Sequence, residues 1–131
     1  MQPYLWIAVG SALGGMARYW CTGAAARLFG ETFPWGTMVV NVTGAFAVGT
    51  LAAAAVFGSV FEAGSDAWLL AVIGFLGSYT TVSSLSWQTL ALARDGEWSR
   101  VVLNVLASLA LGFGAVALGM LAGGAVLQAW S

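Results

Sequence analysis

The chain has 131 residues, of which 60% are hydrophobic and only 7% are charged. Because soluble domains carry roughly 25% charged residues, this composition argues against a water-soluble fold and predicts an integral membrane protein. The net charge of −1 argues against a nucleic-acid partner. With no His and a single Cys, the chain cannot build a multi-Cys or His-based metal site or an intrachain disulfide.

Four apolar stretches account for nearly the whole chain and form one transmembrane domain over residues 1–131. We expect an all-α fold with spans at about 4–29, 34–57, 67–93 and 98–127, each at or above the ~20 residues that a membrane-spanning helix needs. No Lys or Arg precedes the first apolar run, so the charged region of a secretory signal is missing. We therefore expect this run to be retained as span 1.

Span 1 contains a cation, Arg18, about fourteen residues from its start, roughly 21 Å along the helix axis. Two interpretations stay open: its side chain extends to the nearer interface, or it attracts anions at the mouth of an aqueous vestibule. Gly10 and Gly14 form a GxxxG pair in this span, and Gly119 and Gly123 form another in span 4. Such pairs let helices approach closely, and we favour packing within the chain.

Span 2 contains a polar stripe. Thr37, Asn41, Gly44 and Val48 share one helical face because they are three or four residues apart. Asn supplies two N–H donors and Thr one O–H donor. Donors without a fixed negative charge suit a small, strongly hydrated anion, since they can replace its water. The alternative for the Asn is that it only ties helices together.

Span 3 is the most informative part of the sequence, because its middle is not purely apolar. Residues 74–85 contain two glycines, Gly74 and Gly77, and a run of hydroxyl side chains. Backbone that leaves helical geometry at membrane depth must be buried in protein or line a water-filled cavity, and a broken helix frees groups that can bind ions. Hydroxyls that bond back to their own helix are the alternative, but they require no adjacent glycines. We expect a third helix broken near its middle that lines an ion or substrate path.

Span 4 contains a second polar stripe, Asn104, Ser108 and Gly112. For Ser108 we favour a bond back to its own helix, whereas for Asn104 a functional role and a helix-tying role both stay open. The acidic residues all lie in loops or at their edges: Glu31, Glu62, Asp66, Asp95 and Glu97. Proton-coupled transporters usually need an ionisable relay within the membrane, and no Ser–His–Asp set is possible here. We therefore expect no enzyme.

The loops indicate an orientation in the membrane. Arg27, Arg94 and Arg100 flank the loops after spans 1 and 3, and the face that holds the termini has no Lys or Arg nearby. The positive-inside rule would put these two loops in the cytoplasm. Three charges are a weak bias, so insertion in both orientations is the alternative. Because four such helices enclose little volume, we expect a pore to form between two subunits.

The chain resembles the Fluc (CrcB-type) fluoride-channel family in three stretches. Residues 14–19 (Gly-Gly-Met-Ala-Arg-Tyr) are similar to the family's Gly-Gly…Arg-Tyr/Trp motif. Residues 34–44 (Pro-Trp-Gly-Thr-Met-Val-Val-Asn-Val-Thr-Gly) are similar to its Gly-Thr…Asn-x-x-Gly motif. Residues 74–81 (Gly-Phe-Leu-Gly-Ser-Tyr-Thr-Thr), followed by Ser83, resemble its broken third helix. Length, span number and motif order agree, so the resemblance covers essentially the whole chain.

The resemblance implies an antiparallel, dual-topology homodimer in a prokaryotic cell membrane, surrounded by lipid, with two narrow pores that release fluoride passively. Asn41 matches the family's pore Asn, and Arg18 matches its span 1 Arg. Gly77 and Thr80 match positions whose main-chain carbonyls, from both subunits, hold a structural sodium ion at the dimer centre. The other candidate pore residues are Thr37, Thr81, Ser83, Ser84, and, in the polar track of span 4, Asn104 and Ser108.

One pair of positions departs from the family. Its third-helix motif reads Thr-Thr-Phe-Ser-Thr-Phe, and the two Phe rings present electropositive edges to fluoride. Here Val82 and Leu85 stand at those positions. An aliphatic side chain has no ring edge, so this fluoride site cannot be carried over. Three consequences stay open: slower conduction, a different way of binding the anion, or a heterodimer of which this chain is one half.

Two other functions have less support in the sequence. A small dual-topology multidrug transporter depends on a glutamate in its first span, where this chain has Arg18 and no acid. A small assembly subunit with packing-only helices explains the GxxxG pairs but not the glycines and hydroxyls of span 3. We therefore predict a dimeric, fluoride-selective channel.

Overall fold

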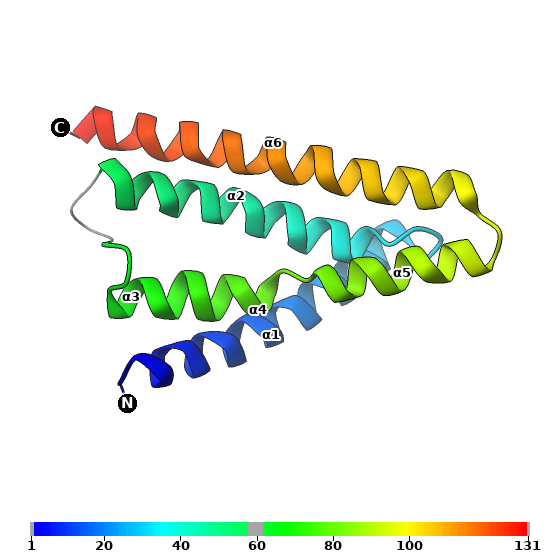
Figure 1. Cartoon of the computed structure of the whole chain (residues 1–131), viewed down its shortest axis with the longest axis horizontal. Helices are drawn as coiled ribbons and strands as arrows, with labels where there is room; N and C mark the ends of the chain where they lie inside the picture. Colours follow the sequence, from blue (N-terminus) through cyan, green and yellow to red (C-terminus); the bar gives the residue numbers. More distant parts are fainter. Residues whose placement is uncertain (1, 58–61, 131) are drawn as a thin grey trace.

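The computed structural model describes residues 2–57 and 62–130, and the regular secondary structure of these residues is entirely helical. The chain passes along the long axis of the molecule in alternating directions, so that both termini lie at one end (Figure 1). In chain order the elements are α1 (Gln2–Phe29), α2 (Trp35–Phe57), α3 (Asp66–Trp68), the π-helix η1 (Leu69–Leu76), α4 (Gly77–Tyr79), α5 (Val82–Arg94) and α6 (Trp98–Trp130).

Three helical segments are long and apolar enough to cross a membrane: Trp35–Val56, Asp66–Arg94 and Trp98–Val126. They bear out an all-helical membrane protein. The helix α1 has 28 residues, about 42 Å at 1.5 Å per residue, but it is less apolar than these three, so span 1 stays a prediction. Large apolar side chains are exposed along the helices, with Phe113 of α6 at 76%, as expected of faces that lipid or another chain covers.

The helices α2 and α6 pack tightly along each other because glycines remove the side chains between them. A Cβ atom on Gly119 would run into the main-chain carbonyl of Phe46, and one on Gly123 would lie 2.7 Å from the carbonyl oxygen of Thr50. A Cβ atom on Gly49, from the α2 side, would meet α6 backbone in the same way. The span 4 GxxxG pair therefore packs within the chain, as predicted.

The span 1 pair behaves similarly towards the third pass of the chain. A Cβ atom on Gly10 would meet the carbonyl oxygen of Leu70, and one on Gly14 would meet that of Phe75. From the other side, a Cβ atom on Gly74 would lie 2.7 Å from the Ile7 carbonyl oxygen. The glycines thus hold α1 against η1, and packing within the chain is confirmed for this pair too.

The end of the molecule opposite the termini carries three of the four arginines. There the Arg100 Nη1 atom lies 2.7 Å from Glu97 Oε2 and donates to the Thr32 carbonyl oxygen at 3.2 Å. These contacts join the loop after α1 to the start of α6. Because the side chains of Arg100 and Glu97 are 44% and 40% exposed, the ion pair adds little stability. The arrangement gathers three arginines, with Glu31, Asp95 and Glu97 among them, at one end.

Candidate functional site

Helical geometry stops in the third pass at two threonines. Thr80 (φ −81°, ψ 159°) and Thr81 (φ −155°, ψ 120°) are extended, and α5 begins at Val82. Gly77 is helical (φ −61°, ψ −31°), so the chain leaves the helix at the hydroxyl residues rather than at a glycine. Thr81 caps α5, because its Oγ1 accepts a hydrogen bond from the Ser84 N–H at 3.2 Å.

Asn41 of α2 holds this interruption with both ends of its amide. Its Oδ1 accepts from the Thr81 N–H at 2.7 Å, and its Nδ2 donates to the Thr81 carbonyl oxygen at 2.9 Å. The two bonds together define which amide atom is oxygen and which is nitrogen. Because an Asn amide has two N–H groups, one donor of Asn41 remains for a further partner.

One turn further along α2, Gly44 lets Thr80 approach the helix. A Cβ atom on Gly44 would run into Thr80 Cγ2 and would lie 3.3 Å from the Tyr79 ring. The Thr80 hydroxyl donates back to the Leu76 carbonyl oxygen at 2.9 Å. The stripe predicted on span 2 therefore faces the interruption of span 3 at both Asn41 and Gly44.

Arg18 of α1 reaches the same place from the other side. Its Nη1 donates to the Thr80 carbonyl oxygen at 3.4 Å, and the side chain is half-buried. The guanidinium group thus lies beside the interruption, where its positive charge can act on ions.

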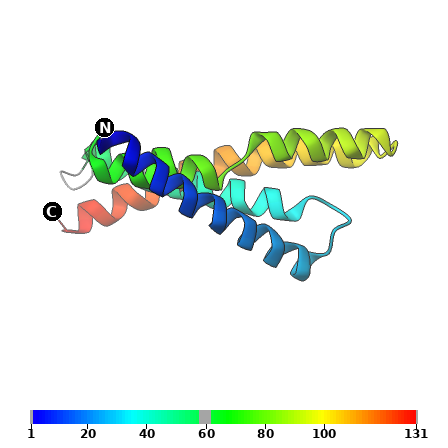
Figure 2. The same ribbon diagram turned by 90° about the horizontal axis from the view of Figure 1, so that it is seen from below.

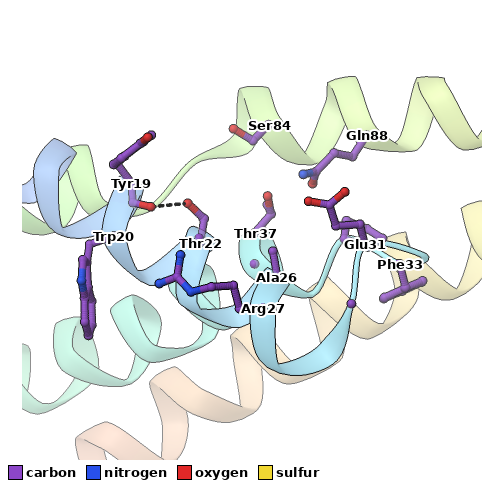
Figure 3. A pocket seen from close by; sticks show the side chains of 14 residues that line it. Tyr19, Trp20, Thr22, Ala26, Arg27, Glu31, Phe33, Thr37, Ser84 and Gln88 are labelled. Carbon is purple, nitrogen blue, oxygen red and sulfur yellow. Dashed lines mark hydrogen bonds between the residues drawn. The ribbon is translucent and has the colours of Figure 1, made fainter.

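A cavity of about 550 Å³ opens between the end of α1, the following loop, the start of α2 and α5. Figure 2 shows α5 and the first half of α6 diverging from the second half of α1 on this side. Thr37, only 3% exposed, lines the cavity from α2, and Ser84 and Gln88 line it from α5 (Figure 3). Arg27 and Glu31 are at its wall as well. The cavity therefore carries neutral donors together with charges of both signs.

Gln88 was missed by the sequence analysis. Its Oε1 is buried without a hydrogen-bond partner among the residues that the structure describes. The signal was present, because Gln88 follows Ser84 by four residues and so shares its helical face.

The hydroxyls after the interruption form a small cluster. Thr81 Oγ1 lies 3.1 Å from Ser83 Oγ and donates to Ser84 Oγ at 3.2 Å. Val82 and Leu85, at the positions of the family's Phe rings, lie away from the cavity. Val82 is 75% exposed, and Leu85 lines a shallow, mainly apolar hollow beside α6.

The two candidates on α6 are separate from this cluster. Asn104 is 1% exposed and donates through Nδ2 to Thr89 Oγ1 at 2.9 Å, so it ties α6 to α5. Ser108 does not form the expected bond back to its helix: its Oγ is buried and has no hydrogen-bond partner in the described part of the chain. That prediction is wrong, and an unpaired buried hydroxyl is costly unless a partner outside the chain satisfies it.

The arrangement offers donors and carbonyl oxygens but no metal-binding acids. Within residues 2–57 and 62–130, no group of three or more His, Cys, Asp or Glu side chains could hold a metal ion. Any cation at the interruption would therefore rely on neutral oxygens, and any anion on amide, hydroxyl and guanidinium donors.

Known proteins resemble this chain along nearly its whole length. A family profile described as "CrcB-like protein, Camphor Resistance (CrcB)" matches residues 5–120. The "fluoride-specific ion channel FluC 2" of Rhodopseudomonas palustris is 56% identical over 93% of this chain and 93% of its own length. The protein of the same name from Bradyrhizobium diazoefficiens is 58% identical over 88% of this chain and 84% of its own. The "fluoride-specific ion channel FluC" of Opitutus terrae is 46% identical over 93% and 92%.

Proposed function

Since this chain belongs to the CrcB family of fluoride channels, we propose that it exports fluoride passively across the prokaryotic cell membrane and so lowers fluoride toxicity in the cytoplasm. The observation that carries the proposal is the pairing of Asn41 with the Thr81 peptide. It opens the backbone of span 3 and leaves one amide N–H of Asn41 to donate to an anion.

The proposed path starts in the cavity. An anion entering there meets Thr37 on α2 and Ser84 on α5. Asn41 follows Thr37 by one helical turn, about 6 Å along the axis. Neutral donors can replace the water around fluoride step by step, and the nearby Arg18 guanidinium offsets its charge. Since channels of this kind only conduct, no catalytic group is needed.

We propose that two copies of this chain, each with four spans and a broken third helix, assemble in antiparallel orientation. Two features support an intersubunit pore. Val82 beside the interruption is 75% exposed, and the buried Ser108 hydroxyl has no hydrogen-bond partner in the described part of a single chain. A second subunit could cover Val82 and give the Ser108 hydroxyl a hydrogen-bond partner. A heterodimer with a related chain is the alternative, and the arginines gathered at one end would suit a fixed orientation.

A structural sodium ion at the dimer centre completes the proposal. The Gly77 and Thr80 carbonyls lie where α4 ends, and helix-terminal carbonyls carry partial negative charge and need partners. Such neutral oxygens suit a hard monovalent cation. When bound, the ion would hold the two interrupted helices together by its charge, while the residues around it shape the site.

Fluoride efflux from liposomes that contain the purified protein tests the function, with a fluoride electrode as the readout and chloride efflux measured in parallel. Rapid fluoride release with little chloride release is expected. No fluoride release from well-folded dimers would refute a homodimeric fluoride channel. Recovery on adding a co-purifying relative would then support the heterodimer.

A further inference from the structure

We propose that Asn41, besides its place in the anion path, is a positioning residue for the cation site. Its side chain takes the Thr81 N–H away from the Gly77 carbonyl and so keeps that carbonyl free to bind a cation. This inference rests on the sodium site of the proposed function. It explains how the chain makes that site, and it makes one side chain serve both ions.

Helical hydrogen bonding would normally give the Gly77 carbonyl a donor. In an uninterrupted α-helix each N–H donates to the carbonyl four residues earlier, so the Thr81 N–H would donate to the Gly77 carbonyl. In this structure it donates to Asn41 Oδ1 at 2.7 Å instead. The Asn41 Nδ2 bond to the Thr81 carbonyl, 2.9 Å, keeps the same peptide turned towards α2. The donor that would close the helix over Gly77 is therefore removed by a residue 40 positions away.

The other carbonyl of the proposed site, that of Thr80, also loses its helical donor. The Ser84 N–H would donate to the Thr80 carbonyl in a continuous helix, but it donates to Thr81 Oγ1 at 3.2 Å. Among the described residues, the hydrogen bond that the Thr80 carbonyl accepts is a long one from Arg18 Nη1, 3.4 Å. Both carbonyls thus lose their helical donors to specific side chains, Asn41 for one and Thr81 for the other.

A carbonyl oxygen and an N–H group that can bond to each other stay apart only if another group holds one of them. If Asn41 lacked its acceptor, the Thr81 N–H would be an unsatisfied donor in a part-buried place, and the Gly77 carbonyl is the helical partner that sequence spacing offers it. Closing that bond would extend α4 by a residue and occupy the oxygen that a cation needs. Cation binding would then have to break the bond first.

The test measures sodium binding through protein stability rather than through flux. Thermal unfolding of the purified full-length protein is followed by tryptophan fluorescence over a series of sodium concentrations, with N-methylglucamine replacing sodium at constant ionic strength. A ligand that binds only the folded state raises the melting temperature with its concentration. In Asn41→Leu, the sodium concentration that produces a given rise should increase about tenfold, because a main-chain hydrogen bond now competes.

Matched variants separate positioning from general damage. Asn104→Leu removes another buried Asn and its bond to Thr89, so it should lower the melting temperature but leave the sodium dependence unchanged. Asn41→Ala removes the same bonds as Asn41→Leu without added bulk, and it decides the matter if Asn41→Leu does not fold.

Three results would overturn the inference. If Asn41→Leu or Asn41→Ala kept the sodium dependence of the unmodified protein, Asn41 would not control the cation site. The cation site itself would not be refuted by that result. If Asn104→Leu weakened the sodium dependence of the melting temperature as much as the Asn41 variants do, the change would reflect only a general loss of stability. An unmodified protein whose melting temperature ignores sodium would refute the cation site and the inference together, whereas fluoride efflux from liposomes would still judge the channel separately.

Discussion

Replacing Gly44 with alanine should disturb the interruption of span 3 through a single methyl group. The new Cβ atom would run into Thr80 Cγ2 and lie 3.3 Å from the Tyr79 ring. Thr80 could turn away only by giving up the bond from its hydroxyl to the Leu76 carbonyl, 2.9 Å, which contributes about 1 kcal/mol. Thr80 is β-branched and short, so it has no flexible end that could move aside.

The expected size of the effect follows from opposing contributions. Overpacking costs about 1–3 kcal/mol, and alanine gains up to about 1 kcal/mol over glycine within a helix. Gly44→Ala should therefore lower the free energy of unfolding by about 1 kcal/mol, and it should reduce fluoride flux because Thr80 adjoins the peptide that Asn41 holds. Thr80→Ser lacks the methyl group but keeps the hydroxyl, so combining it with Gly44→Ala should restore about 1 kcal/mol.

A double-mutant cycle in detergent, with unfolding followed by fluorescence, measures this coupling, and liposome efflux measures the flux. Gly114→Ala is the control, because no described atom outside its own helix lies within 4 Å of the added Cβ; it should be neutral or slightly stabilising. If Gly44→Ala costs the same with and without Thr80→Ser, the steric reasoning is wrong.

Three further predictions concern fluoride flux. Asn41→Asp should suppress it, since a carboxylate beside the path would repel the anion; unchanged flux would place Asn41 outside the pore. Combining Val82→Phe with Leu85→Phe should raise fluoride efflux if the aliphatic pair limits conduction by lacking ring edges, and a fall would show that this pore is built for a different lining. Arg18→Gln should lower the fluoride efflux rate most at low ionic strength, because salt screens the attraction of a part-buried cation for anions. If the efflux rate of Arg18→Gln relative to the unmodified protein did not change with ionic strength, the electrostatic role would be contradicted.

The sequence predicted the helical class and the place of the polar residues well, because both depend on local composition and spacing. The stripe of Thr37, Asn41 and Gly44 follows from helical periodicity alone. The mechanism of the interruption could not be predicted, because it depends on a contact between residues far apart in the chain. Gly74 and Gly77 helped to predict the break, yet Gly77 is helical and Gly74 serves close packing against α1.

The same limit explains the outcome for the span 4 candidates. Whether a membrane serine bonds to its own carbonyl or waits for an outside partner depends on its rotamer and neighbours, which spacing does not specify. Ser108 proved unpaired within the described chain, whereas Asn104 found a partner on α5. Both are polar residues on the same helical stripe, and they differ in the side chains that surround them.

The π-helix η1 makes the third pass of the chain tolerant of one deletion. A π turn takes in one residue more than an α turn, and η1 packs against Gly10 and Gly14 ahead of the peptide that Asn41 holds at Thr81. Deleting one residue of η1 would let it relax to an α-helix with its backbone bonds intact, and Thr80 would stay turned towards Gly44. A deletion in a regular α-helix has no surplus residue to absorb it, so it would rotate everything after it by about 100°. The surplus residue of η1 is therefore the one that span 3 can lose without turning its polar interruption away from α2.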